Sequence, residues 1–254
     1  MISNTSSRQV QSVGTAFRLV GLLQDLDGAT TQDLASRLDL AKSTVHNYLG
    51  TLESLGYVVE REGTYRLGLR FLTHGMAAKS GLPDRDRVSG VLEALARDLS
   101  QPVWWIVAEH GRGLFVGSAA PEDGQAIYGR LGKRSYLHTH APGKAILAQL
   151  PDEAVAEIAE YHGLPVHTRQ TTTDLEALRG DLEVVRDRGY AVSDGEAALG
   201  IRSIGVAFQG SGGHDHALGV FGFSHDFGAN READVSAALQ EAVETLRTPD
   251  GREG

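Results

Sequence analysis

No cysteine occurs among the 254 residues of the sequence. This absence excludes disulfides, thiolate metal sites and a thiol nucleophile, and it favours a reducing compartment such as the cytosol. No apolar run is long enough to span a bilayer, and the first residues, MISNTSSRQVQSVG, lack the apolar core of a signal peptide. Hydrophobic residues make up 41% of the chain, enough for a substantial core. We therefore expect a cytoplasmic globular protein with no membrane partner.

Motifs for catalysis and phosphate binding are also missing. The sequence contains no GxSxG, no GxGxxG, no P-loop spacing and no HExxH. We therefore expect no catalytic residue, no metal and no cofactor. One alternative stays open, because His138 and His140 would share a face on a strand and could serve a metal-dependent enzyme or sensor. Ten histidines in a chain of this length also give such a pair by chance, as ordinary solvated side chains.

The negative charge of the chain is spread unevenly. The net charge is −9, yet residues 1–80 carry eight Lys/Arg and seven Asp/Glu, a balance of +1. The acidity therefore lies in the rest of the chain. The N-terminal region is compatible with an anionic partner, although +1 is not a basic patch, so such binding would depend on a few placed contacts.

The N-terminal periodicity predicts a winged helix-turn-helix over residues 10–72. An apolar stripe of Val13, Ala16, Phe17, Val20 and Leu23 indicates a helix over 13–26. Thr30 with Asp33 has the spacing of a capping box for a second helix. A third helix is predicted over 41–55, with Gly56 at its end. YVVERE, Gly63-Thr64 and YRLGLRF then read as a hairpin. A connecting helix within 69–81 and a break at Gly81-Leu82-Pro83 give a linker over 73–84.

The third helix carries an unusual set of hydrogen-bonding side chains opposite its apolar stripe. In a helix-turn-helix this helix enters the major groove of duplex DNA. A lysine can pair with guanine or phosphate, asparagine can pair with adenine, and hydroxyls can hold phosphate oxygens. The predicted DNA-binding residues are Lys42, Ser43, Thr44, His46, Asn47, Tyr48 and Thr51, with Arg61 and Arg66 from the hairpin. The alternatives are an ordinary solvated face, or a winged helix that binds protein.

The pattern changes over residues 85–250, where helices and strands mix without strict alternation. Helices are predicted over 88–99, from about Pro142, over 151–163, over 174–188 with Asp174 as N-cap, and over 229–247. PVWWIVAEH, LFVGSAA, QAIYGRLG, GYAVSD, IRSIGVAFQG and ALGVFGFSH are predicted strands. This order favours an α+β domain around one mainly antiparallel sheet. Trp104 and Trp105 would point to opposite faces of that sheet, and both are expected in the core.

Long tracts of the chain resemble the IclR family of transcriptional regulators. TTQDLASRLDLAKSTVHNYLGTLESLGYVVEREGTYRLGLRFL looks like its winged-helix domain. HTHAPGKAILAQLP, TTTDLEALRGDLEVVRDRGYAV and EAALGIRSIGVAF are similar to its effector-binding domain. The resemblance, from about Val13 to His225, implies a GAF-like α/β effector-binding domain, a homodimer or dimer of dimers, a roughly palindromic operator and no catalysis. The family commonly has arginine at the position of Asn47, so this chain loses one cationic contact and phosphate anchoring rests more on Lys42 and the wing. The change leaves open an adenine contact that arginine would not make.

The predicted effector site is the start of the helix near Pro142. Backbone N–H groups at a helix start lack partners within the helix and suit a carboxylate. The alternative is that Gly143 allows close packing and Lys144 is solvated. The resemblance implies contacts from Ala141, Pro142, Ser193, Ser203, Gly222 and Ser224, alongside Gly143. Family members typically have Asp at 193, Cys at 203 and Ser at 222. Because Ser193 removes a negative charge, we expect a small organic acid as effector.

Overall fold

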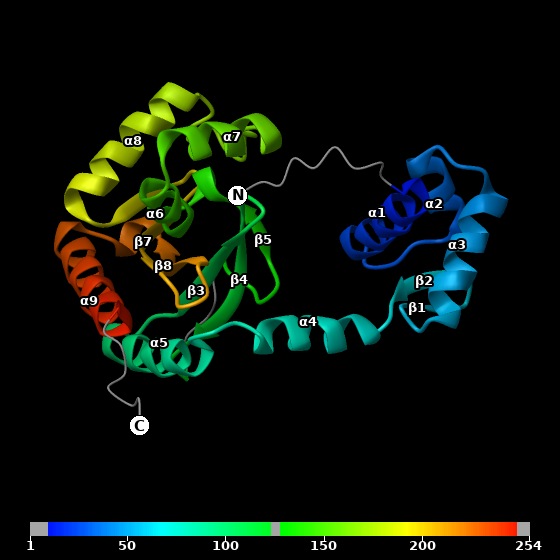
Figure 1. Cartoon of the computed structure of the whole chain (residues 1–254), viewed down its shortest axis with the longest axis horizontal. Helices are drawn as coiled ribbons and strands as arrows, with labels where there is room; N and C mark the ends of the chain where they lie inside the picture. Colours follow the sequence, from blue (N-terminus) through cyan, green and yellow to red (C-terminus); the bar gives the residue numbers. More distant parts are fainter. Residues whose placement is uncertain (1–9, 123–127, 248–254) are drawn as a thin grey trace. The chain divides into compact units, whose positions relative to one another are not determined.

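The protein, seen here as a computed structural model, is described over residues 10–122 and 128–247. The chain divides into two compact units, with the division between Gly81 and Leu82, inside the predicted linker. Figure 1 shows the elements of each unit, and each unit is described by itself below. Within the described ranges, no helix has both the length and the apolar character needed to cross a membrane.

The first unit has the element order of a winged helix-turn-helix. It contains α1 (Gln11–Asp25), α2 (Thr31–Leu38), α3 (Lys42–Ser54), β1 (Val58–Arg61), β2 (Thr64–Leu67) and α4 (Arg70–Ser80). The predicted capping box is present, because the Asp33 N–H donates to Thr30 Oγ1 at 3.2 Å while the Asp33 carboxylate accepts from the Thr30 N–H. β1 and β2 pair antiparallel across a turn with positive φ at Glu62 and Gly63, as a type I′ hairpin requires.

The core of the first unit forms where the three helices meet the hairpin. Leu19 of α1, Leu34 of α2, Val45 and Leu49 of α3 are fully buried, and Val58 of β1 closes the cluster. On α2 and α3 these positions belong to the apolar stripes read from the sequence. The opposite side of α3 is thereby turned outward. On α1 the predicted stripe is wrong, because Leu19 and Leu23 are buried while Val13 and Phe17 are exposed.

The connecting helix α4 is fixed to the first unit at its beginning. The Tyr57 hydroxyl is hydrogen-bonded to His74 Nε2 at 2.6 Å, and the Phe71 ring lies 4.9 Å from the Tyr57 ring. The Arg70 guanidinium donates to the Leu55 carbonyl and lies over the Tyr57 ring. A rotation of α4 is therefore transmitted to the end of α3 and the start of β1, where Leu55 and Tyr57 lie.

The second unit is built on a six-stranded antiparallel sheet in the order β5-β4-β3-β8-β7-β6. Its strands are β3 (Val103–Glu109), β4 (Arg112–Ala119), β5 (Arg134–Tyr136), β6 (Ala191–Asp194), β7 (Ile201–Gln209) and β8 (Asp215–Phe223). The helices are α5 (Arg85–Leu99), α6 (Ala141–Gln149), α7 (Asp152–His162), α8 (Leu175–Arg188) and α9 (Ala229–Arg247). α8 begins at the predicted cap, where Asp174 accepts from the Ala177 N–H at 2.9 Å.

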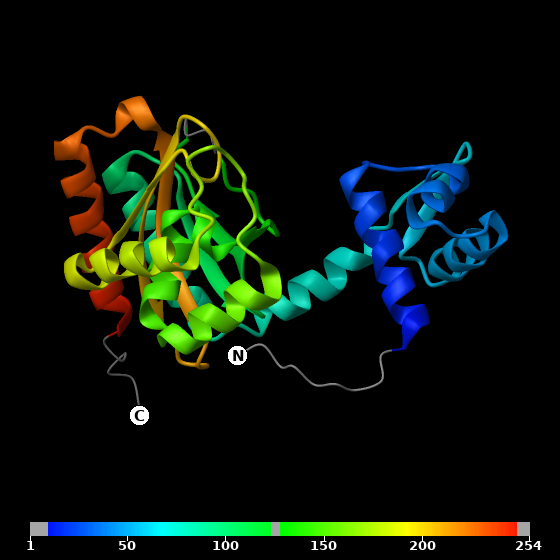
Figure 2. The same cartoon turned by 90° about the horizontal axis from the view of Figure 1, so that it is seen from above.

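Two apolar layers cover the two faces of this sheet. One cluster joins α5 and α9 to one face, and the other joins α6, α7 and α8 to the opposite face (Figures 1 and 2). Trp105 belongs to the first cluster and Trp104 to the second, and each is almost fully buried. The prediction that adjacent tryptophans enter the core from opposite faces is confirmed.

The predicted strand over residues 125–132 is misplaced. Residues 125–127 lie outside the described residues, and residues 128–132 form no strand. The strand that pairs with β4 is β5, which begins at Arg134. Gly132 and Lys133 bond to the backbone of Phe115, but Gly132 has a left-handed φ of 77° and turns the chain there, so the regular ladder starts only afterwards.

The entry of the chain into the second unit is tied to the turn between β7 and β8. Asp84, which precedes α5, accepts from the Ser211 N–H at 2.7 Å and from the Ser211 hydroxyl at 2.6 Å. Gly212 lies against Pro83, since a Cβ added there would be 2.7 Å from the proline Cγ. The first residues after Gly81 and the β7–β8 turn therefore move together.

Candidate DNA-binding and effector sites

The outer face of α3 carries the predicted DNA-binding side chains. Lys42, Ser43, His46, Asn47 and Thr51 are exposed, whereas Thr44 and Tyr48 are half-buried and Tyr48 packs against the core. Not every one of these groups is free, because the Thr51 hydroxyl donates to the Asn47 carbonyl at 2.9 Å.

The first turn of α3 differs from that of α2. Ala41 occupies the N-cap and gives no side-chain hydrogen bond, whereas Thr30 caps α2. The first N–H groups of α3 are therefore not used by a cap, and they can donate to a phosphate oxygen. Lys42 lies in this same turn, so backbone donors and an ammonium are presented together.

The two wing arginines are in different situations. Arg61, the last residue of β1, is exposed, and Arg66 of β2 is exposed but lies 3.4 Å from an Asp27 carboxylate oxygen. Because the carboxylate is almost fully exposed, this ion pair is weak and can exchange for a phosphate. Both side chains are available to an anion.

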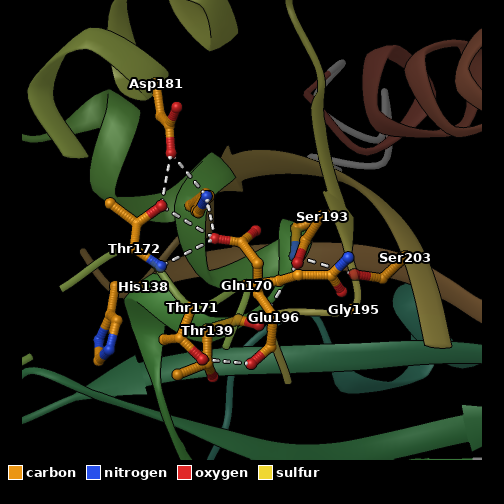
Figure 3. Close-up of polar contacts among 12 residues, drawn as sticks. His138, Thr139, Gln170, Thr171, Thr172, Asp181, Ser193, Gly195, Glu196 and Ser203 are labelled. Carbon is orange, nitrogen blue, oxygen red and sulfur yellow. Dashed lines mark hydrogen bonds and ion pairs between the residues drawn. The ribbon is translucent and has the colours of Figure 1, made fainter. Parts of the chain in front are cut away.

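In the second unit, three of the expected effector residues converge beneath the start of α6. Ser193 and Ser203 are directly paired on β6 and β7. The Ala141 N–H donates to Ser203 Oγ at 3.0 Å, and the Ser193 hydroxyl donates to the Thr139 carbonyl at 3.4 Å (Figure 3). All four residues are buried, so the loop before α6 is bonded to the row of serines.

Gly222 and Ser224 lie apart from this row. A Cβ added at Gly222 would be 2.4 Å from Phe227, which belongs to the cluster on the α5–α9 face. Phe221, directly opposite Ser203 in the β7–β8 register, is the β8 residue on the α6 face. Gly222, the position implied by the family resemblance, therefore lies on the other face of the sheet from the serine row, because neighbouring residues of a strand face opposite sides. Ser224 follows β8, and its hydroxyl donates to Asp194 at 2.6 Å.

The start of α6 is not an open set of donors, so the prediction of an accessible backbone there is wrong. The Ala141 N–H is bound by Ser203, the Gly143 N–H donates to His140 Nδ1 at 3.1 Å, and Pro142 has no N–H. A Cβ added at Gly143 would be 2.2 Å from the Leu137 carbonyl oxygen. Close packing, the alternative reading of Gly143, is what the structure shows.

His138 and His140 are neither solvated nor on a strand. His138 lies in a 3₁₀ turn (Leu137–Thr139), with Nε2 3.2 Å from the Pro165 carbonyl, and burial lowers its pKa to about 4. Burial lowers the pKa of His140 to about 3. Because His140 Nδ1 accepts from Gly143, its Nε2 carries the proton and donates to Ser135 Oγ at 2.7 Å.

Both histidines are thus neutral and already hydrogen-bonded. In the described part of the chain, no group of three or more His, Asp or Glu residues is arranged to hold a metal ion. The shared-face argument failed because the segment turns at Leu137 instead of continuing as a strand.

The alternative reading that Lys144 is solvated is wrong. Its side chain is 4% exposed, and Nζ donates to Asp181 at 2.8 Å and to Glu196 at 2.7 Å. Glu196 also accepts from the Thr172 N–H and lies within hydrogen-bond distance of the Thr172 hydroxyl (Figure 3). Sequence reasoning missed this network. The available signal was APGKAILA, where lysine is the only polar side chain on a helix that is apolar all round.

These two units define a class of protein, a winged helix-turn-helix regulator with an antiparallel α/β effector unit. Residues 12–62 match the family described as "IclR helix-turn-helix domain", and residues 78–248 match "Bacterial transcriptional regulator IclR C-terminal". The chain belongs to the IclR family of transcriptional regulators.

Relatives and solved structures agree with this membership. The probable HTH-type transcriptional regulator ArcR of Halobacterium salinarum is 30% identical over 82% of this chain and 81% of its own length. XynR of Escherichia coli is 27% identical over 78% of this chain and 79% of its own. The fold matches an IclR regulator from Alicyclobacillus acidocaldarius with a TM-score of 0.79, 26% identity and coverage of 94% and 98%. It also matches an IclR homologue from Microbacterium hydrocarbonoxydans, complexed with 4-hydroxybenzoate, with a TM-score of 0.71, 22% identity and coverage of 92% and 97%.

Proposed function

We propose that α3 inserts its outer face into the major groove of an operator and that the second unit adjusts this binding when it takes up a small organic acid. The exposed face of α3, with its uncapped first turn, is the observation that carries the DNA-binding part. Lys42 and the wing arginines hold phosphates, and Asn47 reads an adenine. In this role the protein acts in the cytoplasm, without catalysis.

We also propose that the protein works as a dimer or a dimer of dimers. The first unit exposes apolar side chains on α1 and around α4, namely Val13, Phe17, Leu69, Leu72 and Met76. Exposed apolar side chains of this size suit a contact with a second copy of the chain. A second copy that covers them would present two α3 helices to successive major grooves, about 34 Å or a multiple apart, so the operator is roughly palindromic.

For the effector, the proposed site is the row of Ser193 and Ser203 under the loop that ends at Ala141, Pro142 and Gly143, with Phe221 in place of Gly222. The absence of a carboxylate at Ser193 supports an anionic ligand. The relative bound to 4-hydroxybenzoate is an example of an IclR homologue with an organic acid. The linker over 73–84 transmits ligand binding to the first unit. The resulting change in the free energy of DNA binding is limited by how strongly the ligand prefers one arrangement of the units.

A selection from genomic DNA fragments, followed by mobility shifts on the enriched sequence, tests the DNA-binding part. Lys42→Ala should weaken binding to every fragment and reduce the slope of log affinity against log salt by about 0.9, because one phosphate contact is lost. Asn47→Ala should relax base preference at one position, by about 1–3 kcal/mol. Lys79→Ala, near the end of α4, is the matched lysine control and should change neither.

The proposal has clear contrary outcomes. If Asn47→Ala weakens all sequences equally, Asn47 does not read a base. If the wild-type chain shows no preference for any genomic fragment over random duplex, with or without added organic acids, α3 is not a DNA-recognition helix, and a protein partner for the winged helix becomes the better hypothesis.

A further inference from the structure

Lys133 is a half-buried cation beside the proposed effector row. Its carbonyl accepts from the Phe115 N–H at 2.9 Å, just before β5 begins. Its ammonium lies 3.0 Å from the centre of the Tyr128 ring and 5.7 Å from the centre of the Phe115 ring. It donates a hydrogen bond to the Tyr128 carbonyl at 3.4 Å. Across residues 10–122 and 128–247, no carboxylate forms an ion pair with it.

The contrast with Lys144 is informative. Lys144 is also withdrawn from water, and two carboxylates neutralise it at 2.7 and 2.8 Å. Among the residues that the structure describes, the Lys133 ammonium contacts ring faces and one carbonyl, while the nearby Arg130 adds to the positive potential. Burial, together with Arg130, lowers the pKa of Lys133 to about 8. A desolvated ammonium without a counter-ion is stabilised by an anion that comes to it.

The surroundings of Lys133 are aromatic. The Tyr128 ring stacks on Phe221 at 5.0 Å with an interplanar angle of 22°. Phe115 lies 5.8 Å from Phe221 and 5.8 Å from His140, whose imidazole is neutral. Phe221 is directly opposite Ser203, so this aromatic cluster, formed by Phe115, Tyr128, His140 and Phe221, adjoins the effector row.

Tyr128 indicates what the cluster accepts. It places a phenol ring on Phe221, under a cation, with the Thr139 side chain beside its hydroxyl. The Thr139 carbonyl also accepts a hydrogen bond from the Ser193 hydroxyl. A free phenol that carries a carboxylate could make the same stacking and hydroxyl contacts and, in addition, supply the negative charge that Lys133 lacks.

We propose that Lys133 is the anion-pairing residue of a site for aromatic carboxylates, and that the ligand ring takes the place of Tyr128 on Phe221. This rests on the proposed effector role of the second unit and specifies the class of effector. The ammonium pairs with the ligand carboxylate, the ring packs between Phe115 and Phe221, and a ring hydroxyl reaches Thr139.

Isothermal titration calorimetry on the full chain tests the site, with 4-hydroxybenzoate as the probe. The neutral 4-hydroxybenzamide lacks the carboxylate, and 4-hydroxycyclohexanecarboxylate lacks the aromatic ring. Each should therefore bind at least about tenfold more weakly. Lys133→Met should lower affinity for 4-hydroxybenzoate by about tenfold or more, and Lys133→Arg should restore most of it. Arg247→Gln, which removes an exposed cation at the end of α9, is the control and should retain tight binding.

Two further readouts separate pairing from a structural role. Near pH 8, binding should take up protons in the wild type, because a carboxylate raises the pKa of Lys133 from its value of about 8. The Lys133→Arg variant should take up none there, since guanidinium stays charged. Tyr128→Ala should bind several-fold more tightly, because the ring no longer competes for Phe221 and the ammonium. Weaker binding by Tyr128→Ala would overturn the displacement of that ring.

The inference is overturned if wild-type protein does not bind 4-hydroxybenzoate at millimolar concentration, or if Lys133→Met binds as the wild type does while circular dichroism shows it folded. Mobility shifts on the selected DNA are run on the same samples. DNA binding without Lys133-dependent binding of the acid leaves the DNA-binding proposal intact and removes this one. Binding of the acid without any DNA preference does the reverse.

Discussion

Replacing Lys144 with methionine should destabilise the second unit by about 3–5 kcal/mol. Methionine keeps most of the side-chain volume and removes the ammonium, so the change acts on charge more than on packing. Glu196, whose side chain is 8% exposed, would then be a buried carboxylate without a cation. Removing one partner of a buried ion pair has a cost of this size because the other charge stays desolvated.

The exposure of Asp181 and Glu196 decides how much each contributes to the loss of stability. Asp181 is 44% exposed and water can replace the lost ammonium there, so most of the effect comes from Glu196. Glu196→Gln keeps the contact with Thr172 and leaves Lys144 paired with Asp181, so it should cost less, about 1–3 kcal/mol. The double variant should be less destabilised than the sum of the singles, because it removes the unpaired carboxylate together with its partner.

Urea unfolding followed by tryptophan fluorescence is a suitable assay. The chain has two tryptophans, at 104 and 105, so the signal reports the second unit alone. Arg179→Met, which breaks a surface pair with Glu176 on α8, is the matched control and should change stability by less than about 1 kcal/mol. If Lys144→Met is no more destabilising than Arg179→Met, the buried network contributes nothing and the reasoning fails.

Two more predictions concern the same unit. Gly143→Ala should destabilise the second unit by about 3 kcal/mol or more, because the new Cβ would meet the Leu137 carbonyl oxygen at 2.2 Å. Gly180→Ala on α8 is the control in the same urea assay. A Cβ there has nothing within 4 Å, so this change should stabilise the unit by about 0.5–1 kcal/mol. Burial lowers the pKa of His216 to about 4, below the 6.5 of an unfolded histidine. The unfolded chain therefore binds more protons as the pH falls through 6.5, and stability drops toward pH 4. From pH 7.5 to 5 this residue should account for about 2 kcal/mol of lost stability. His216→Leu should show a shallower pH dependence, and an unchanged one would refute the assignment.

The local elements were largely predictable because their signals are local. The capping box of Thr30 and Asp33, the N-cap at Asp174 and the alternation at Trp104 and Trp105 each depend on neighbours in the sequence. The order of the winged-helix elements and the exposed face of α3 followed from equally local signals, the apolar periodicity of α2 and α3 and the turn residues between the elements. The antiparallel sheet was also predicted, apart from the strand misplaced by the turn at Gly132.

The effector side was less predictable because it depends on partners far along the chain. Lys144 is buried only because Asp181 and Glu196 reach it from 37 and 52 residues away. The donors at the start of α6 are occupied by Ser203 and by the His140 side chain, which a sequence pattern does not show. The register between β7 and β8 fixes which face of the sheet Phe221 and Gly222 occupy, and that register is not visible from spacing alone.

The two hydrogen bonds between Asp84 and Ser211 couple the chain's entry into the second unit to the β7–β8 turn. β7 and β8, which carry Ser203 and Phe221, run from the proposed effector end of the sheet to the turn that holds Ser211. Because that turn is fastened to the first residues after Gly81, tilting this strand pair would pull directly on the chain segment leading to the DNA-reading unit. A change in strand tilt would thus reach the segment that precedes α5 through the Asp84–Ser211 hydrogen bonds.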